Sequence, residues 1–435
     1  MTGTDIDFTK LIEDEFLKHD PLYILKQKWG RWRVERRRQK LTKLEVENGQ
    51  MSCSAQLCIE AKWIVGDTDD FDKLEAQLEQ IDESFKVAKQ PDPNAQDPKD
   101  GSFGLCYKEW FHKQDAMIVA TTNMYDTGEV PEYPFTFMDF IGTPEKMRDV
   151  FTPLITSNIA KTGINNRDAI GAATGAMSQL VYKDYMREWV RENVKGFDLS
   201  EAYCDAYAKF IDDWQNPDTG FWGEWYQSDG KIYKSDDLSF TYHTISYRRG
   251  KVEMWDKIIE TLFEMKNKEY PFGWKWDGHF NNHNSYDVVK IFKYGWKHMT
   301  PAQQAHASID IQEMLDWCLN VSLQPDGSFK PYPKFYNSYG ATFYYGVAFL
   351  SKVGYFDSGA PFWRPEPFPE GKKTCRKILK RLDELGLDDN AAQSAKEILE
   401  DACGCTPAPA TTLHVDHKNA REELAQHAIK AKRQT

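Results

Sequence analysis

The sequence lacks any apolar run long enough to cross a membrane, which takes roughly 18 residues in a helix. Its first residues, Met1 to Phe8, are polar and acidic and do not have the pattern of a secretory signal. Cysteine is sparse: the chain has eight in 435 residues, and they are scattered. No CxxC pair occurs. We therefore expect a cytoplasmic protein with reduced thiols and no membrane partner.

A basic surface is also missing. The net charge is −12, with 67 Asp and Glu against 55 Lys and Arg, so nucleic acid is not an expected partner. No phosphate loop or dinucleotide fingerprint occurs, and we predict no cofactor. His279 and His283 are spaced as metal ligands on a helix would be, with Asp277 or Asp287 nearby, but a fixed fourth ligand is lacking, so we predict no metal site.

Helical patterns are abundant. Charged amphipathic segments alternate with segments of small, polar and aromatic residues. We predict charged helices at residues 145–160, 187–213, 251–267 and 302–321. We predict the other type at residues 166–182, 236–248, 283–295 and 338–352. Pairing residues 22–48 with 49–64, and 72–88 with about 115–124, brings the total to six helical hairpins.

The links between these hairpins repeat. Gln215-Asn-Pro-Asp218-Thr-Gly220 follows one charged helix, and Gln324-Pro-Asp326-Gly327 follows another. Gly220, Gly273 and Gly327 are 53 and 54 residues apart. Such a period is typical of stacked or closed arrays of repeats, in which glycine turns the chain and a following aromatic residue packs on the preceding helix.

This turn motif resembles that of α/α toroids, which include terpene cyclases, protein prenyltransferases and many carbohydrate-active (α/α)6 barrels. The resemblance covers roughly residues 50–355. It implies an all-α fold, with an (α/α)6 toroid over residues 1–365. We predict a helical extension packed on the toroid at residues 366–405 and a flexible charged tail at residues 406–435.

In a toroid the inner helices surround a central cavity, so polar residues at their starts should converge. Four segments and one link supply candidates. They are Asn166, Arg167 and Asp168; Trp222 and Glu224; Asp237, Tyr242 and His243; His279, Asn282, His283 and Tyr286; and Tyr336 and Tyr339.

The segment Asn281-Asn282-His283-Asn284-Ser285-Tyr286 is similar to the Asn-Asn-His segment of toroid polysaccharide lyases, especially alginate lyases. The resemblance implies cleavage of a uronate-containing oligo- or polysaccharide by β-elimination. Asn282 would neutralise the uronate carboxyl group, and His283 would be the base or its helper. Tyr336 or Tyr339 would be the acid. The family also places an arginine near the tyrosine, a role that would fall to Arg167 or Arg248.

Other interpretations stay open. A glycoside hydrolase would use two of the carboxyl groups of Glu224, Asp236, Asp237, Asp277 and Asp287. An epimerase would use His243 and His283 as acid and base. Asp236-Asp237 matches only part of a terpene-cyclase motif. A sugar-binding toroid without catalysis is the fourth interpretation. For single residues the plain alternatives are a helix cap for Asp237, a core hydrogen bond for His243 and core packing for Trp222.

Overall fold

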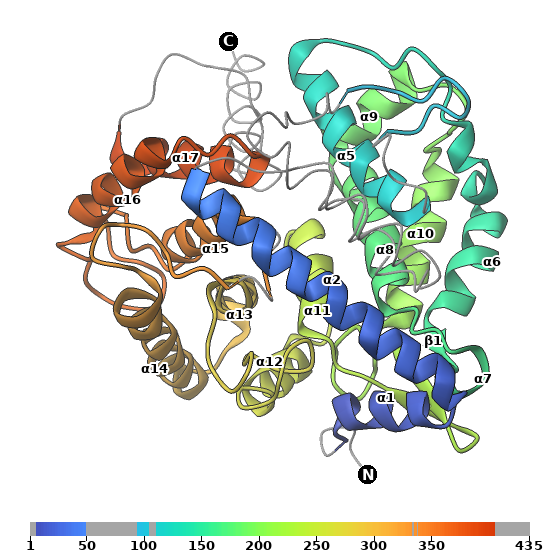
Figure 1. Cartoon of the computed structure of the whole chain (residues 1–435), viewed down its shortest axis with the longest axis horizontal. Helices are drawn as coiled ribbons and strands as arrows, with labels where there is room; N and C mark the ends of the chain where they lie inside the picture. Colours follow the sequence, from blue (N-terminus) through green and yellow to red (C-terminus); the bar gives the residue numbers. More distant parts are fainter. Residues whose placement is uncertain (1–5, 49–93, 104–109, 333–334, 337, 405–435) are drawn as a thin grey trace.

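The computed structural model describes residues 6–48, 94–103, 110–332, 335–336 and 338–404. These residues are mostly helical, with one small sheet (Figure 1). None of the described helices combines the length and the apolar character that a membrane span needs. The predicted helices 49–64 and 72–88 and the predicted tail 406–435 lie outside the described residues.

The helices follow one another with short links. The bounds are α1 Phe8–Leu17, α2 Pro21–Asn48, α5 Trp110–Thr127, α6 Pro144–Leu154, α7 Ile159–Thr162, α8 Arg167–Tyr182, α9 Asp184–Asn193, α10 Glu201–Trp214, α11 Leu238–Tyr247, α12 Trp255–Glu264, α13 Asn282–Gly295, α14 Pro301–Trp317, α15 Tyr339–Lys352, α16 Gly371–Leu385 and α17 Asn390–Cys403. Short 3₁₀ segments lie at Thr136–Ile141 and Trp296–His298, and a π turn extends α14 at Cys318–Ser322.

A row of central helices organises the molecule. α5 packs on α8, α8 on α11, α11 on α13, α13 on α15, and α15 on α17. The charged helices α6, α12, α14 and α16 lie on the outer side of this row (Figure 1). Burial follows the predicted alternation, since eleven of the 14 residues of α13 are buried but only five of the 17 in α14.

Three predicted helices differ from the structure. The segment 187–213 is two helices, α9 and α10, because Gly196 adopts a left-handed φ of 84° and Ser200 caps the new helix. The segment 145–160 stops at Leu154, and the chain then enters a short strand. The other charged and small-residue helices agree with the predictions to within a few residues at each end, except that residues 251–267 form a shorter helix, α12.

The sheet was not predicted. β1, Thr156–Ser157, pairs in parallel with β2, Trp225–Ser228, which pairs in antiparallel with β3, Lys231–Lys234. The turn between β2 and β3 is Asp229-Gly230, whose φ angles are both positive, as a two-residue hairpin requires. The sheet brings Ser157 next to the link that precedes β2.

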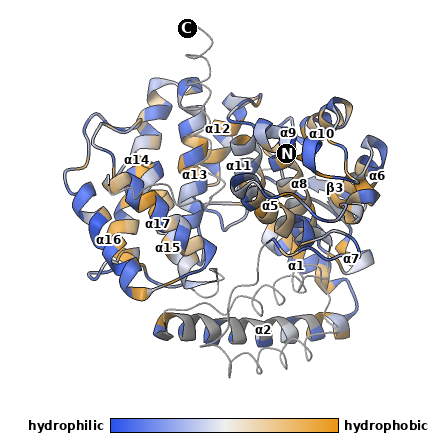
Figure 2. Cartoon of the chain, turned by 90° about the horizontal axis from the view of Figure 1, so that it is seen from above, coloured by the Kyte–Doolittle hydropathy of each residue, from blue (hydrophilic) through white to orange (hydrophobic). Residues whose placement is uncertain are grey.

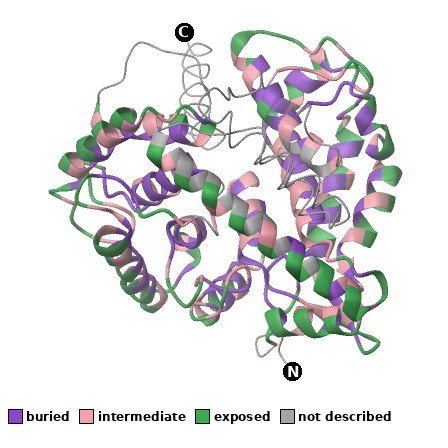
Figure 3. Ribbon diagram, viewed as in Figure 1, coloured by how far each residue is buried: buried purple, intermediate pink, exposed green. Residues whose placement is uncertain are grey.

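One hydrophobic core runs through the described helices. It contains Phe292 of α13 and Val347 of α15, and also Ile378 of α16 and Leu399 of α17. Figure 3 shows buried residues along the central helices of the molecule. A smaller cluster attaches α1, where Phe8 packs on Tyr226. Figure 2 shows α2 along one side of the molecule.

Candidate functional site

A cavity of about 250 Å³ lies between α8 and α11. It exists because α8 carries small residues on this side, and nothing lies within 4 Å of the position where Gly175 would carry a Cβ. The lining residues are Arg167, Asp168, Gly171, Ala172, Thr174, Gly175 and Ser178 of α8, Ser239, Phe240, His243, Thr244 and Tyr247 of α11, and Trp214 and Tyr270. Three of the predicted site residues, Arg167, Asp168 and His243, therefore share one cavity.

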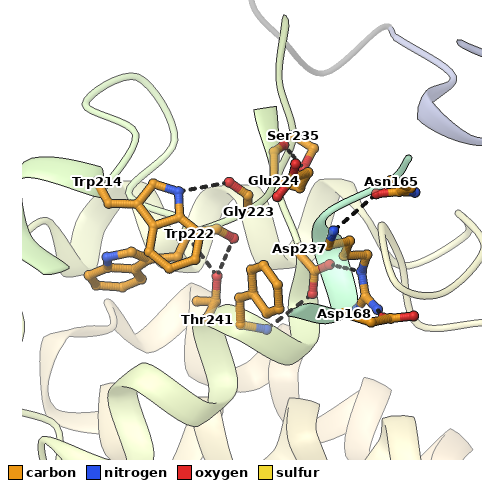
Figure 4. A network of polar contacts seen from close by, with 11 residues as sticks. Asn165, Asp168, Trp214, Trp222, Gly223, Glu224, Ser235, Asp237 and Thr241 are labelled. Atoms are coloured by element: carbon orange, nitrogen blue, oxygen red, sulfur yellow. Dashed lines mark hydrogen bonds and ion pairs between the residues drawn. The ribbon is translucent and has the colours of Figure 1, made fainter. Parts of the chain in front are cut away.

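Arg167 is the cation of the cavity. Its Nε donates to Asp237 Oδ2 at 2.7 Å, and its Nη1 donates to Asp168 Oδ1 at 2.8 Å (Figure 4). Burial lowers the pKa of Arg167, but attraction to Asp237 and Asp168 outweighs it, and the pKa stands well above the ordinary value. Asp168 keeps 45% of its side chain exposed, whereas the Asp237 side chain is fully buried.

Asp237 links the start of α11 to Arg167 at the start of α8. Its Oδ1 accepts from the backbone N–H of Phe240 at 3.0 Å and so caps α11, while Oδ2 faces Arg167. Asp237 is thus a helix cap, and it is joined to the cavity through Arg167 without being one of the lining residues. The cap fixes where α11 begins, and thereby where His243 lies on the cavity wall.

Glu224 lies behind this ion pair in the link before β2 (Figure 4). It is fully buried, and its Oε1 accepts from Ser157 Oγ at 2.6 Å. Its Oε2 has no hydrogen-bond partner among the described residues. Burial raises the pKa of Glu224 well above its usual value, while the hydrogen bond from Ser157 and the charge of Arg167 act in the opposite direction.

Tyr270 connects the cavity to α13 and was missed by the sequence analysis. Its hydroxyl is hydrogen-bonded to Ser239, and its ring centroid lies 5.6 Å from that of His283. Burial, and next the charge of Asp287, raise its pKa. Its position three residues before Gly273, one of the three regularly spaced glycines, was the available signal, but that segment was interpreted only as a turn.

His283 sits among aromatic rings. Tyr345 is 4.4 Å and Phe335 5.0 Å from its centroid, and its Nδ1 lies 3.2 Å from Asn284 Oδ1. Burial lowers the pKa of His283 to about 4, so the imidazole is neutral at physiological pH. A neutral imidazole can accept or donate a proton with its two nitrogens.

Tyr336, predicted as one of two possible acids, contacts the backbone of His283. The backbone N–H of His283, in the first turn of α13, donates to the Tyr336 hydroxyl, and burial raises the pKa of that phenol. The ring of Tyr336 stacks on Tyr345 at 5.5 Å, with 18° between the planes. Tyr345 was not among the predicted residues, although it contacts His283 directly.

Several predicted residues lie elsewhere. Asn282 is buried, and its Nδ2 donates to Ser322 Oγ at 2.9 Å. Tyr339 is hydrogen-bonded to Ser328 and packs on Phe343, on the side of α15 that meets the link after α14. His279 is exposed in a turn that pairs with Trp276.

The remaining candidates are structural or form a separate cluster. Asn166 precedes α8, and its backbone N–H donates to Ser157 Oγ at 2.8 Å. Trp222 is fully buried, and its indole donates to the carbonyl of Ile211 at 2.8 Å. Tyr242 and Tyr286 make an edge-to-face pair with ring centroids 5.6 Å apart, and both hydroxyls lie within 3.4 Å of the amine of Lys290. These two tyrosines lie between α11 and α13, and neither lines the cavity.

Metal binding has no clear donor set in the described part of the chain. No group of three His, Cys, Asp or Glu residues there is placed to hold an ion. His279 precedes Asn281, the cap of α13, so His279 and His283 do not share a helix and their spacing is not that of a helical ligand pair. The alternative metal site, with Asp277 or Asp287 beside the two histidines, depended on that helical spacing and is not supported by the structure.

The cavity thus offers a fixed guanidinium, a half-exposed carboxylate, the phenols of Tyr247 and Tyr270 and the imidazole of His243. The imidazole of His283 is not part of the lining and contacts the ring of Tyr270. These groups can bind an anionic or polyhydroxylated ligand and move a proton on it, and no single chemistry is unique to them. Comparison of the chain with protein-family models, with curated proteins and with solved structures found no match.

Proposed function

We propose that the protein is a carbohydrate-active enzyme of the lyase class, which cleaves a uronate-containing oligosaccharide by β-elimination in the cavity between α8 and α11. We further propose that the row of central helices belongs to an (α/α)6 toroid. The order of packing from α5 to α17 and the outer charged helices support that architecture. The carbohydrate is the proposed partner, and the polar, aromatic lining of the cavity suits it.

The observation that carries the proposal is the position of Tyr270. It lies on the cavity wall with Arg167 and His243, and its ring contacts the neutral His283. Elimination next to a carboxylate needs a cation for the carboxylate, a base and an acid, and these residue types meet around Tyr270.

The reaction would run as follows. Arg167 binds the uronate carboxylate and draws charge from the adjacent carbon. His243 takes the proton from that carbon, the electron pair forms a carbon–carbon double bond, and the bond to the leaving oxygen breaks. Tyr270 gives its proton to that oxygen, and His283 orients the phenol. One proton is removed and one is delivered, so the cleavage needs no external reductant or oxidant.

The charge around Arg167 is compatible with an anionic substrate. Its bond to Asp237 is buried, but its partner Asp168 is half-exposed. Exposed ion pairs contribute little, typically about 0–1 kcal/mol. A substrate carboxylate can therefore replace Asp168 at Arg167 at small cost, while Asp237 keeps the guanidinium in place.

A sugar epimerase is the second candidate, because histidines occur on either side of Tyr270. His243 lines the cavity and His283 contacts the phenol from α13. A hydrolase is less well supported, since Asp168 is the one carboxylate among the lining residues of the described chain and a glycosidase needs two.

Ultraviolet absorbance of the unsaturated product tests the proposal. The full-length protein is assayed with a panel of uronate-containing oligosaccharides, and absorbance should rise. Tyr270→Phe should lower kcat by about 10²–10⁴-fold, the usual contribution of a general acid. Tyr355→Phe is the matched control, since its hydroxyl contacts Thr374 far from the cavity.

Two results would contradict the elimination. New reducing ends on neutral sugars without absorbance would indicate hydrolysis. Exchange of the carbon-bound proton with solvent deuterium, without cleavage, would indicate epimerisation.

A further inference from the structure

Asp168 places a negative charge on the wall of a cavity that is proposed to bind an anion. In the described chain, Arg167 and Asp168 are the two lining residues with an Arg, Lys, Asp or Glu side chain. Arg167 carries one positive charge, and its partners Asp237 and Asp168 carry one negative charge each, so the three groups together carry −1. With both carboxylates in place, this group of charges does not attract an anion.

Asp237 is the partner that cannot leave Arg167. Its carboxylate is fully buried, and it accepts from Arg167 Nε at 2.7 Å and from the backbone N–H of Phe240 at 3.0 Å. The Arg167 guanidinium also lies 5.3 Å from the centre of the Phe240 ring, in a cation–π contact. These contacts hold the guanidinium against the start of α11 whether or not Asp168 is bound to it.

Asp168 is the partner that can leave. Its side chain is 45% exposed and accepts one hydrogen bond from Arg167 Nη1 at 2.8 Å (Figure 4). Adjacent residues of a helix do not face each other, so the geometry of α8 does not favour this contact. When released, the carboxylate stays in the first turn of α8, where the helix dipole stabilises an acidic group. Release therefore costs at most about fivefold in an equilibrium constant, as for other exposed ion pairs.

The ligand that displaces Asp168 most readily is one that offers two oxygens. A carboxylate can accept two parallel hydrogen bonds from one guanidinium. Because Nε of Arg167 is bound to Asp237, the donors for such a pair are Nη1 and Nη2, and Asp168 occupies Nη1 with a single bond. A ligand carboxylate thus forms two charge-assisted bonds where it breaks one, whereas a hydroxyl group or a chloride ion forms only one.

We propose that Asp168 is a specificity-determining residue of the cavity. It occupies Arg167 in the absence of substrate and gives way to a carboxylate that binds with two oxygens. From its place beside Arg167, its charge then disfavours ligands with a second negative charge. This role rests on the proposed binding of a uronate at Arg167, and it restricts the substrate to uronates without a sulfate or phosphate group on the same sugar residue.

Calorimetric titration with three small probes tests this role. Glucose, glucuronate and inorganic sulfate carry charges of 0, −1 and −2, and low ionic strength keeps the screening of these charges weak. The full-length parent should bind glucuronate more tightly than sulfate. Asp168→Asn keeps the size of the side chain but removes its charge.

The effect of Asp168→Asn should grow with the charge of the probe, because electrostatic repulsion is proportional to that charge. Glucose should bind both proteins equally weakly or not at all. Glucuronate should bind the variant about 2–5-fold more tightly, the value of an exposed ion pair that no longer has to be broken. Sulfate should gain by a larger factor, so the preference for glucuronate over sulfate should decrease.

Asp184→Asn is the matched control. Asp184 is also an acid in the first turn of a helix, α9, and its Oδ1 lies 2.9 Å from Arg187 Nη2 with 56% of the side chain exposed. It does not line the cavity. The substitution changes the net charge of the chain by the same one unit as Asp168→Asn, but it should leave the affinities for all three probes unchanged.

Three results would overturn the role of Asp168. Equal gains for glucuronate and sulfate would show that it does not select by charge. Weaker binding of glucuronate to Asp168→Asn would show that Asp168 binds the ligand and does not compete with it. Failure of glucuronate to bind either protein would show that Arg167 is not an anion site.

The proposed elimination can fail separately, because these titrations measure binding and not cleavage. A charge-dependent gain in Asp168→Asn, without ultraviolet absorbance on any uronate oligosaccharide, would keep the role of Asp168 and reject the lyase. Cleavage by the parent, with no charge-dependent gain in the variant, would keep the lyase and reject this role.

Discussion

Asp237 uses its two carboxylate oxygens for different elements. One caps α11 through Phe240, and the other holds Arg167 at the start of α8. Because the carboxylate is fully buried, its charge depends on Arg167 for compensation. At the residue scale, the ion pair is therefore part of the framework of the cavity as well as of its chemistry.

Replacement of Arg167 by methionine should destabilise the fold. Arg167→Met leaves Asp237 buried with its cap but without its cation. We expect a loss of about 2–3 kcal/mol in the free energy of unfolding, because a buried charge loses its partner. Urea denaturation measures it. Arg148→Met on the outer helix α6 is the control, and an equal loss in both variants would contradict this role for the pair.

His283 should make stability depend on pH. Its pKa is about 4 in the folded chain and near 6.5 when unfolded, so between these values the unfolded chain binds the proton and the folded chain does not. The stabilisation is complete above pH 6.5 and is lost as the pH falls toward 4, by up to about 3 kcal/mol. Denaturant unfolding from pH 7 to 4.5 measures it.

His283→Gln is the comparison. Burial raises the pKa of Asp236 to about 6, which favours the folded state at low pH, but this contribution is common to both proteins and cancels in the difference. The variant should lose less stability on acidification than the parent. Parallel pH curves for the two proteins would show that His283 is not buried as a neutral imidazole.

Only part of the site could be predicted from residue order. Arg167 and His243 were found because they occur at or near the start of helices that the turn motif located. Tyr339 was expected in the site and Tyr345 was not, because the choice depends on how α15 is rotated about its axis. That rotation is set by contacts such as Phe343 on Phe329, which join segments distant in sequence.

At the element scale, α15 and α17 pack closely where Gly340 of α15 meets Asp389, the N-cap of α17. A Cβ added at Gly340 would lie 2.0 Å from Asp389 Oδ2. The Asp389 carboxylate also caps α17, accepting from the backbone N–H groups of Ala391 and Ala392. The fit of the two helices and the start of α17 therefore depend on the same few atoms.

Two helical glycines should respond oppositely to alanine. Gly340→Ala gains helix propensity but displaces Asp389 from its cap, and we expect a net loss of about 1–3 kcal/mol. Gly175→Ala in α8 meets no atom within 4 Å, so we expect a gain of about 0.5–1 kcal/mol. Thermal unfolding followed by circular dichroism compares the two. Equal shifts would contradict the close packing of α15 on α17.

The existence of most described helices could be predicted because the 3.6-residue period is a local property. The break between α9 and α10 could not be, since Gly196 is tolerated by a helical pattern. Its turn is held by the backbone N–H of Phe135, which donates to the carbonyl of Lys195 at 2.8 Å. The two-residue strand β1 has no period of its own, and only its partner β2 defines it.

At the scale of the whole molecule, α16 and α17 contribute residues to the main hydrophobic core. Leu399 and Cys375 are fully buried in the same cluster as the central helices. The helices of the predicted extension, residues 366–405, therefore share buried residues with the helices that precede them.

Removal of α16 and α17 should show whether the core depends on these two helices. A chain ending at Arg364 loses α17 and uncovers the face of α15, so we expect loss of cooperative unfolding and association through that face. A chain ending at Gly404 keeps every described core residue and is the control. Calorimetry and size-exclusion chromatography distinguish the two. A sharp transition at an unchanged temperature in the shorter chain would refute the prediction.

The pairing of β1 with β2 has a consequence for how the chain folds. It joins Thr156 to Trp225 and so closes a loop that contains α7 to α10. Closing a loop of this length costs chain entropy before its contacts are formed, whereas the enclosed helices form locally and fast. We expect those helices to form first and the bond from Ser157 to Glu224 late. The support behind Arg167 would then be assembled in one of the last steps of folding, after the walls of the cavity exist.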